Sequence, residues 1–242
     1  MTGEIGIIHV PSAEEPFLLV NKPAGLASAP LRGGDDSAVT RLLADFPEIA
    51  RVRGRKAVEG GLVHRLDTQT SGLLLIAASQ EFYDRIIAEQ EAGLFVKTYT
   101  AECDDARNMP PAEGFPPRPP FADQVKAGCG GYSRSVESRF RPWGPHGREV
   151  RPVSDASGLG AVKKASPGLY RTELSIVPHG TGILCATCRI TRGYRHQVRC
   201  HLAWLGFPVK GDGLYNPAAK ADVPLCFHAT GLAFLGLSFT LD

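Results

Sequence analysis

Long apolar segments are missing from this chain, and their absence limits what it can encode. The longest apolar run is Leu73–Ala78, far short of the roughly 20 residues that a transmembrane helix needs. The N-terminal sequence MTGEIGIIHVPSAEEP contains no basic segment followed by a long apolar stretch, so no signal peptide is visible. We therefore expect a cytoplasmic protein without a membrane partner.

The chain also lacks the motifs of several common enzyme classes. It contains no GxxxxGK[ST] phosphate loop, no GxGxxG fingerprint and no GxSxG nucleophile elbow. Hydride transfer and nucleotide hydrolysis therefore have no support. We expect no nucleotide cofactor, and chemistry that depends on side chains alone.

Metal-binding spacing is scarce as well. The six cysteines are scattered, and the only CxxC pair is Cys185 and Cys188. This pair lies in ILCATCRI, an expected strand, where residues three apart point to opposite faces. The nearby His196, Cys200 and His201 supply no second CxxC pair, so we expect no metal site. All six thiols are expected to be free (Cys103, Cys129, Cys185, Cys188, Cys200 and Cys226).

What the chain does have is enough apolar content for a core and an uneven distribution of charge. It has 242 residues, of which 43% are hydrophobic, which excludes global disorder. The formal net charge is only +2, yet basic residues gather at 51–56, 132–171 and 189–210. Such clusters suit a polyanion bound to one surface, although ordinary solvated faces would have the same composition.

Hydrophobic periodicity predicts more strands than helices. Strands are expected at 17–20, 72–78, 95–103, 170–177, 183–190, 227–234 and 237–241, with a short one near 147–153. Helices are expected at 39–46, 80–91 and 194–205. Because the two types do not alternate strictly, the pattern predicts an α+β fold, with a mostly antiparallel mixed β-sheet, flanking helices and long basic loops. We expect a single domain over 1–242 that contains a loop-rich insertion at 104–169.

The stretch GLVHRLDTQTSGLLLIAA at 61–78 places a carboxylate directly ahead of the most apolar strand. Asp67 is either a turn residue whose side chain accepts backbone amides or a reactive group mounted on a rigid strand. Arg65 shares a face with it in extended chain. Taken alone, the stretch slightly favours the turn.

Two later stretches offer partners for that carboxylate. On the strand at 95–103, Lys97 and Tyr99 point the same way, which suits either ordinary packing or the stacking of a planar ring beside a cation. On the helix at 194–205, Arg199 lies either on a solvated basic side or against a buried acid, which it would keep ionised.

Five ordered blocks resemble the RluA-type pseudouridine synthases, which act on ribosomal and transfer RNA. They read NKPAGL at 21–26, HRLDTQTSGLLL at 64–75, KTYTA at 97–101, HQVRCHLA at 196–203 with GFPVKGD at 206–212, and LCFHA at 225–229. The resemblance implies the pseudouridine synthase catalytic fold, isomerisation of uridines in RNA, an RNA partner and no cofactor. We also expect a monomer that has no extra N-terminal RNA-binding domain.

The resemblance also implies roles for single residues. Asp67 takes the place of the catalytic aspartate, Tyr99 that of the characteristic tyrosine, and Arg199 that of the arginine that pairs with the aspartate. The residues implied to bind substrate are Arg65, which would occupy the gap left by the extruded uridine, Leu225, which would line the uracil pocket, and His64 and Lys97 from the same blocks.

One block departs from the family pattern, and two other functions compete with isomerisation. Tyr194 stands where the family usually has an arginine, so an RNA contact is expected to be rearranged there. A non-catalytic RNA-binding or RNA-folding module would share the basic clusters but would not need Asp67. A hydrolase would use His64 with Asp67, yet these are three apart in an expected extended segment and have no nucleophile motif beside them.

Overall fold

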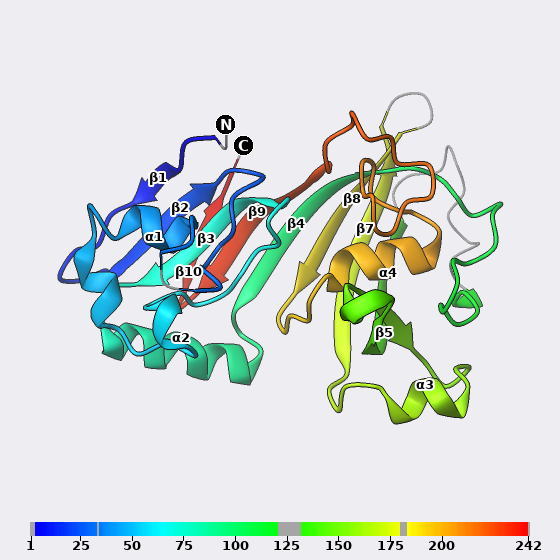
Figure 1. Cartoon of the computed structure of the whole chain (residues 1–242), viewed down its shortest axis with the longest axis horizontal. Helices are drawn as coiled ribbons and strands as arrows, with labels where there is room; N and C mark the ends of the chain where they lie inside the picture. Colours follow the sequence, from blue (N-terminus) through cyan, green and yellow to red (C-terminus); the bar gives the residue numbers. More distant parts are fainter. Residues whose placement is uncertain (1–2, 33, 121–131, 180–182, 242) are drawn as a thin grey trace. The chain divides into compact units, whose positions relative to one another are not determined.

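The computed structural model describes residues 3–32, 34–120, 132–179 and 183–241, which form two compact units (Figure 1). Unit 1 comprises Met1–Lys97 and His228–Asp242, and unit 2 comprises Thr98–Phe227. Cys129, one of the expected free thiols, lies outside the described residues. No helix in the described ranges is both long and apolar enough to cross a bilayer.

Unit 1 is built on a mixed sheet. Its strands lie in the order β1 (Gly6–His9), β2 (Phe17–Lys22), β3 (Ser71–Ala77) and β9 (Phe227–Phe234), and β10 (Leu237–Thr240) pairs with β9. The β1–β2, β2–β3 and β9–β10 ladders are antiparallel, whereas β3 and β9 are parallel. Because β3 is central, its run of leucines is buried on both faces, as continuous apolar strands usually are.

The core of unit 1 lies between this sheet and α2 (Gln80–Ala92). Ser79 caps the helix by accepting a hydrogen bond from the Phe82 amide at 3.2 Å, and Gly93 ends it in the left-handed conformation. Phe82 and Ile86 pack against Phe17 and other buried strand residues. Shorter helices, α1 (Ala38–Leu42), η1 (Pro47–Arg51) and η2 (Ala57–Glu59), fill the segment between β2 and β3.

Unit 2 is built on a second run of strands. Their order is β4 (Val96–Cys103), β8 (Leu184–Ile190), β7 (Tyr170–Pro178), β5 (Tyr132–Trp143) and β6 (Glu149–Val153). The ladders from β8 to β6 are antiparallel. Together with unit 1, this confirms the expected α+β class with a mixed, mostly antiparallel sheet.

Helix α4 (Gln197–Leu205) packs on one face of the unit 2 strands and is buried on almost every side. The interpretation of a helix with a solvated basic side is therefore wrong. The reason is that its polar residues have buried partners: His201 contacts Ser138 on β5 and Thr172 on β7, at 2.9 and 2.8 Å. Burying polar groups is tolerable when each one is hydrogen-bonded in this way.

The segment at 104–169 contains more regular structure than its composition suggested. The short strand expected near 147–153 is present as β6, but the twelve-residue strand β5 was not anticipated. The short helices η4 (Pro145–Gly147) and α3 (Leu159–Lys163) also lie there. Its proline-rich part is tied to α4, because the Trp204 indole N–H donates to the carbonyls of Pro116 and Pro117 at 3.1 Å.

Candidate active site

The loop that carries Asp67 is fixed on both sides by hydrogen bonds. Ser28 makes two bonds to the backbone of Leu66, from its hydroxyl to the carbonyl at 2.8 Å and from the Leu66 amide at 2.9 Å. The Gly25 amide donates to the Thr68 carbonyl at 2.8 Å. The block NKPAGL, which opens the family resemblance, thus lies against the block HRLD and holds it in place.

Asp67 begins a tight turn and is itself half-buried. The Thr70 amide donates to the Asp67 backbone carbonyl at 3.0 Å, closing the turn. A backbone hydrogen bond therefore closes the turn. Gly72 follows at the point where β3 meets β9, with φ of +118°, and a Cβ there would clash with the Ala229 backbone. Only glycine allows this close approach.

Lys22 is a member of this site that the sequence alone did not single out. Its side chain is fully buried, and its ammonium donates to the carbonyls of Pro23, Leu26 and Thr68 at 2.9, 2.7 and 3.3 Å. Burial lowers the pKa of Lys22 to about 8, and the nearby Asp67 charge opposes that shift. The lysine thus places a positive charge near Asp67 while it ties two loops together.

His64 is a buried neutral imidazole. Its Nε2 accepts a hydrogen bond from the Leu75 amide at 3.2 Å, so the proton of the neutral ring lies on Nδ1. Burial, with a smaller contribution from the Lys97 charge, lowers the pKa of His64 to about 3. A base this weak, and this enclosed, does not suit the hydrolase alternative that pairs His64 with Asp67.

Lys97 is buried near His64. It shares the buried face of β4 with Tyr99, as the strand alternation predicted. Its ammonium lies 5.7 Å from the centre of the Phe95 ring. Burial, and to a smaller extent the charge of Arg55, lowers the pKa of Lys97 to about 8. Arg65 differs: its side chain is 52% exposed, and its guanidinium lies 3.5 Å from the buried Glu59 carboxylate.

Tyr99 and Leu225 are predicted site residues that belong to unit 2. Tyr99 is buried, and its ring stacks on Phe227 with a centroid distance of 5.1 Å and an interplanar angle of 6°. Leu225 is half-buried, two residues before Phe227. Phe227 was missed from the sequence because the alternating pattern of β9 marks it only as a core residue.

Arg199 is held by Asp212, an acid that the sequence analysis did not single out. Its guanidinium forms a two-pronged ion pair with Asp212, at 2.8 and 2.7 Å, and both side chains are buried. The Asp212 carboxylate also accepts hydrogen bonds from the backbone amides of Leu214 and Tyr215, at 3.0 and 3.3 Å. Such geometry fixes the guanidinium orientation. Pairing of Arg199 with Asp67, which belongs to unit 1, stays a prediction.

The remaining polar residues of the HQVRCH block anchor α4. The Gln197 side-chain amide donates from Nε2 to the Arg171 carbonyl at 2.9 Å and to the Thr172 hydroxyl at 3.1 Å, both on β7. His196, at the N-terminal cap, contacts the Tyr215 hydroxyl at 3.0 Å. The block therefore positions the helix and, through it, Arg199.

Tyr194, which stands where the family usually has an arginine, packs into an aromatic cluster. Tyr194 stacks on Phe140 with a centroid distance of 5.0 Å and an angle of 9°, and it also contacts Tyr170. The guanidinium of Arg192 lies 5.3 Å from the centre of the Tyr170 ring. The tyrosine thus serves an aromatic cluster beside α4. Whether an RNA contact is rearranged there stays a prediction.

The part of the chain that the structure describes contains no candidate metal-binding site. There, His, Cys, Asp and Glu side chains do not gather in any group of three or more that could hold an ion. Cys185 and Cys188 alternate between the two faces of β8, the second being fully buried. This is the geometry that the strand interpretation predicted.

Known proteins share this architecture. The structure of human RNA pseudouridylate synthase domain containing 1 superposes with a TM-score of 0.67, covering 99% of this chain and 83% of that one, at 18% identity. At this identity the likeness establishes the fold alone: the pseudouridine synthase fold, as expected.

Sequence comparison identifies the family. The sequence model described as RNA pseudouridylate synthase matches residues 16–204, so the chain belongs to the RNA pseudouridylate synthase family. An uncharacterized RNA pseudouridine synthase of Chloroflexus aurantiacus is 29% identical over 218 residues, which make up 90% of this chain and 57% of that protein. Ribosomal large subunit pseudouridine synthase D of Pseudomonas aeruginosa is 26% identical over 206 residues. The chain spans 52% of that second protein, so it covers little more than half the length of either relative.

Proposed function

We propose that this chain is an RNA pseudouridine synthase, with Asp67 as its catalytic carboxylate and with ribosomal or transfer RNA as its substrate. The observation that carries the proposal is the construction of the Asp67 loop. The loop lies in the family's HRLD block, is tied to Gly25 of NKPAGL and to Ser28 just after it, and has the buried Lys22 ammonium close by. A carboxylate held this firmly suits covalent or proton-transfer chemistry.

The reaction breaks the N1–C1′ bond of a uridine, turns the base and joins C1′ to C5. The hydrogen on C5 is lost to water and N1 gains a proton, so nothing is oxidised and no cofactor is needed. Asp67 acts either as a nucleophile at C1′ or as a base toward the sugar. Both routes require an ionised carboxylate, which the positive charges of Lys22 and Arg199 would favour.

The other predicted residues would handle the base and the strand. A uridine in folded RNA must be flipped out to reach the site, and the exposed Arg65 would fill the gap it leaves. Phe227 covers one face of the Tyr99 ring, so only the opposite face can stack on the uracil, and its hydroxyl would help remove the C5 proton. Leu225 would line the uracil pocket, and Lys97 and His64 would contribute to substrate binding, as the family resemblance implies.

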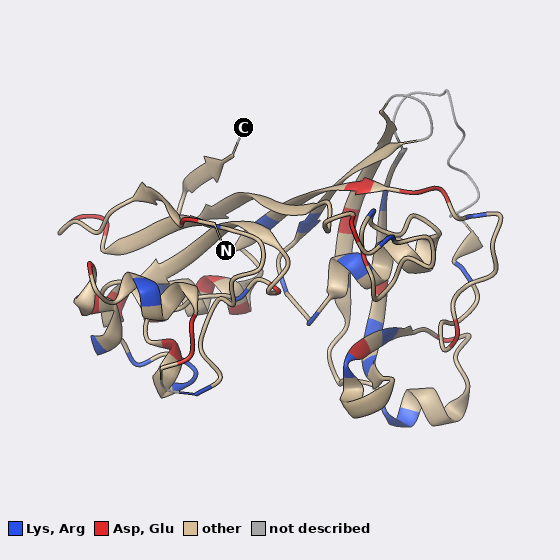
Figure 2. Ribbon diagram, turned by 45° about the horizontal axis from the view of Figure 1, so that its top comes forward, with Lys and Arg blue, Asp and Glu red and all other residues tan. Residues whose placement is uncertain are grey.

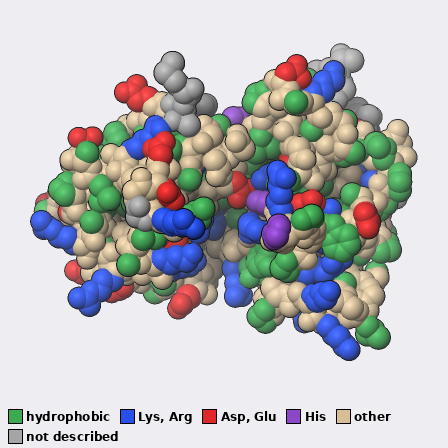
Figure 3. Space-filling model, in the orientation of Figure 1, with side chains coloured by type: hydrophobic (Ala, Val, Ile, Leu, Met, Phe, Trp, Pro, Cys, Tyr) green, Lys and Arg blue, Asp and Glu red, His purple; other side chains and the backbone are tan. Residues whose placement is uncertain are grey.

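Exposed basic residues would hold the RNA backbone. In unit 1 the segment at 51–56 exposes Arg51, Arg53, Arg55 and Lys56. Figure 3 shows that Lys and Arg side chains reach the surface of each unit, interspersed with acidic ones. Contacts of this kind make the affinity depend on salt.

The test measures release of tritium from an RNA that carries C5-tritiated uridine. We expect release with the unaltered chain and none with Asp67→Asn, because the amide can neither attack C1′ nor accept a proton. Asp45→Asn, the same change at an exposed position, is the matched control and should release tritium normally. Turnover retained in Asp67→Asn would show that another group performs the chemistry.

A further inference from the structure

The unit 2 strands have a second, open face that the proposed reaction does not use. Along β7, Thr172, Leu174 and Ile176 are buried on the α4 side, whereas Arg171 and Glu173 are exposed. The alternation on β5 and β8 is the same. Helix α4, which carries Arg199, therefore covers one face and leaves the other to solvent.

Residues on the open face form rows across three strands. The strand register places Ser133, Ser175 and Thr187 side by side, so three hydroxyl groups form one row. The next row is Ser135, Glu173 and Arg189. Cross-strand neighbours of this kind lie roughly 5 Å apart, which is close enough for two of them to bind the same small group.

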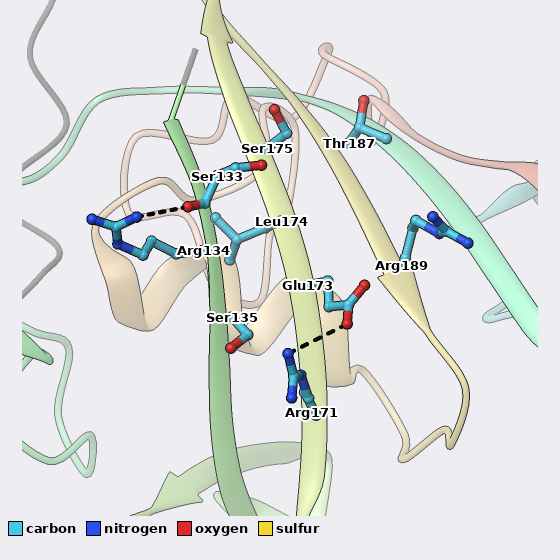
Figure 4. Close-up of a pocket in the computed structure, with 9 residues that line it drawn as sticks. All are labelled: Ser133, Arg134, Ser135, Arg171, Glu173, Leu174, Ser175, Thr187 and Arg189. Atoms are coloured by element: carbon cyan, nitrogen blue, oxygen red, sulfur yellow. Dashed lines mark hydrogen bonds and ion pairs between the residues drawn. The ribbon is translucent and has the colours of Figure 1, made fainter. Parts of the chain in front are cut away.

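A hollow of about 440 Å³ lies over these rows (Figure 4). Three arginines, four hydroxyl residues, one glutamate and one leucine line it: Arg134, Arg171, Arg189, Ser133, Ser135, Ser175, Thr187, Glu173 and Leu174. The strand register pairs Arg134 with Leu174, whose side chain is buried on the α4 side. The charged residues of the open face that line the hollow are therefore Arg171, Arg189 and Glu173, and they lie beside four hydroxyl groups. Figure 2 shows Lys and Arg positions on the strands of unit 2 among mostly uncharged residues.

The arginines differ in how they are engaged. Arg171 lies 3.4 Å from Glu173 and 3.8 Å from Glu137, and all three side chains are about half exposed. Ion pairs so exposed are weak and open readily. The Arg134 guanidinium donates to the Ser133 carbonyl at 3.1 Å. Arg189, in contrast, makes no hydrogen bond or ion pair with any other residue in the described ranges, so its donors point to solvent.

We infer that this hollow binds a phosphodiester group of RNA, in a segment other than the one that carries the target uridine. Phosphate oxygens accept hydrogen bonds from both guanidinium and hydroxyl groups. A protein partner is disfavoured, because the lining offers a single aliphatic side chain and no aromatic anchor. The choice of RNA as the polyanion rests on the proposed function.

The position of the hollow determines what the contact does. Arg199 and α4 occupy the opposite face of the same strands, so a nucleotide in the hollow cannot also be the flipped uridine. The contact therefore adds affinity for RNAs long enough to reach both faces. It contributes nothing to the isomerisation of a short RNA that fills only the catalytic site.

The test uses a 20-nucleotide RNA of adenosines, which contains no uridine to be isomerised. Arg189→Gln should weaken its binding at low salt and reduce the slope of log affinity against log salt by about 0.7, the value for one contact to single-stranded RNA. Glu173→Gln should have the opposite effect and strengthen binding, because it removes a negative charge from the lining. Arg85→Gln, a matched change at an exposed position of α2, should leave affinity and slope unchanged.

Three outcomes would overturn the inference. The first is unchanged binding in Arg189→Gln. The second is equal binding of inorganic phosphate and the RNA, as judged by competition at constant ionic strength, which would indicate a site for free anions. The third is capture of a protein by the unaltered chain but not by Arg189→Gln.

A separate measurement distinguishes this inference from the proposed function. Arg189→Gln should still release tritium from a short uridine-containing stem-loop. If no RNA releases tritium even with the unaltered chain, the proposed function fails, but the binding experiment still tests whether the hollow binds RNA.

Discussion

At the scale of single residues, Lys97 carries a positive charge into a buried position beside the Phe95 ring. It makes no hydrogen bond or ion pair with another residue that the structure describes. Burial lowers its pKa from 10.5 to about 8, and a shift of that size corresponds to about 3 kcal/mol against the charged form at neutral pH. The charge is therefore retained at a cost in stability, which is usual for residues that serve function.

Replacing Lys97 with methionine should stabilise the chain at pH 7 by roughly 1–3 kcal/mol, because an apolar group of similar length removes the buried charge. The gain should vanish with rising pH. Between pH 8 and 10.5 the unfolded lysine still binds a proton that the folded one has lost, so the unaltered chain gains free energy of unfolding with pH and the variant does not. Urea denaturation at several pH values measures both the difference in free energy of unfolding at pH 7 and its change with pH.

The matched control is Lys220→Met, in which an exposed lysine is replaced. Its free energy of unfolding should follow that of the unaltered chain at every pH. If Lys97→Met proved less stable than the unaltered chain at pH 7, the ammonium would be making a favourable interaction that outweighs its burial. With RNA, we expect Lys97→Met to lose affinity for the substrate.

At the scale of elements, the loop at 63–70 depends on its ties to NKPAGL, and Lys22 is the most central of these. Without its ammonium, the buried carbonyl of Leu26 and the half-buried carbonyls of Pro23 and Thr68 lose a donor. Unsatisfied buried carbonyls cost free energy, and the loop would relieve that cost by moving. Asp67 would then lose both a nearby positive charge and its fixed position.

We therefore expect Lys22→Met to reduce kcat at least tenfold, with a smaller change in KM, because the carboxylate is misplaced after the RNA has bound. Single-turnover tritium release at saturating RNA separates the two quantities. Lys220→Met again serves as the control for losing one lysine. An unchanged kcat, with RNA affinity reduced instead, would show that Lys22 acts on binding and not on the position of Asp67.

The elements that were predicted correctly are those in which apolar residues alone determine burial. The leucine run of β3 and the capped helix α2 were both expected from such patterns. Strand β5 was missed because Ser138 occupies a buried position, where the His201 imidazole satisfies its hydroxyl. A pattern of apolar residues cannot show a buried serine whose partner lies on a distant helix.

In the candidate site, too, residues within short sequence blocks were predicted, whereas residues that act through contacts between distant segments were not. Asp67, Tyr99 and Arg199 were identified because short blocks of residues resemble a family. Lys22 and Asp212 were not, because their importance arises from contacts between segments that are distant in the chain or across a turn. Lys22 reaches Thr68, and Asp212 reaches Arg199. Distances of this kind appear only when the chain is folded.

At the scale of the whole molecule, the two compact units are not separated by linkers. The boundary between Lys97 and Thr98 lies inside β4, and the boundary between Phe227 and His228 lies inside β9. Unfolding one unit alone would have to break both strands, one or two residues from where each begins. We therefore expect the chain to unfold as a single domain, as its sequence predicted.

The two tryptophans make this testable, because Trp143 and Trp204 both belong to unit 2. Their fluorescence reports on unit 2, whereas far-ultraviolet circular dichroism also includes α2 and the strands of unit 1. In a urea titration the two signals should give the same midpoint and the same m value, as one cooperative transition requires. A Phe82→Trp variant, which places a probe in the unit 1 core, should report that midpoint too, shifted only by its own effect on stability. Separate midpoints for dichroism and fluorescence in the unaltered chain would mean that the units unfold independently.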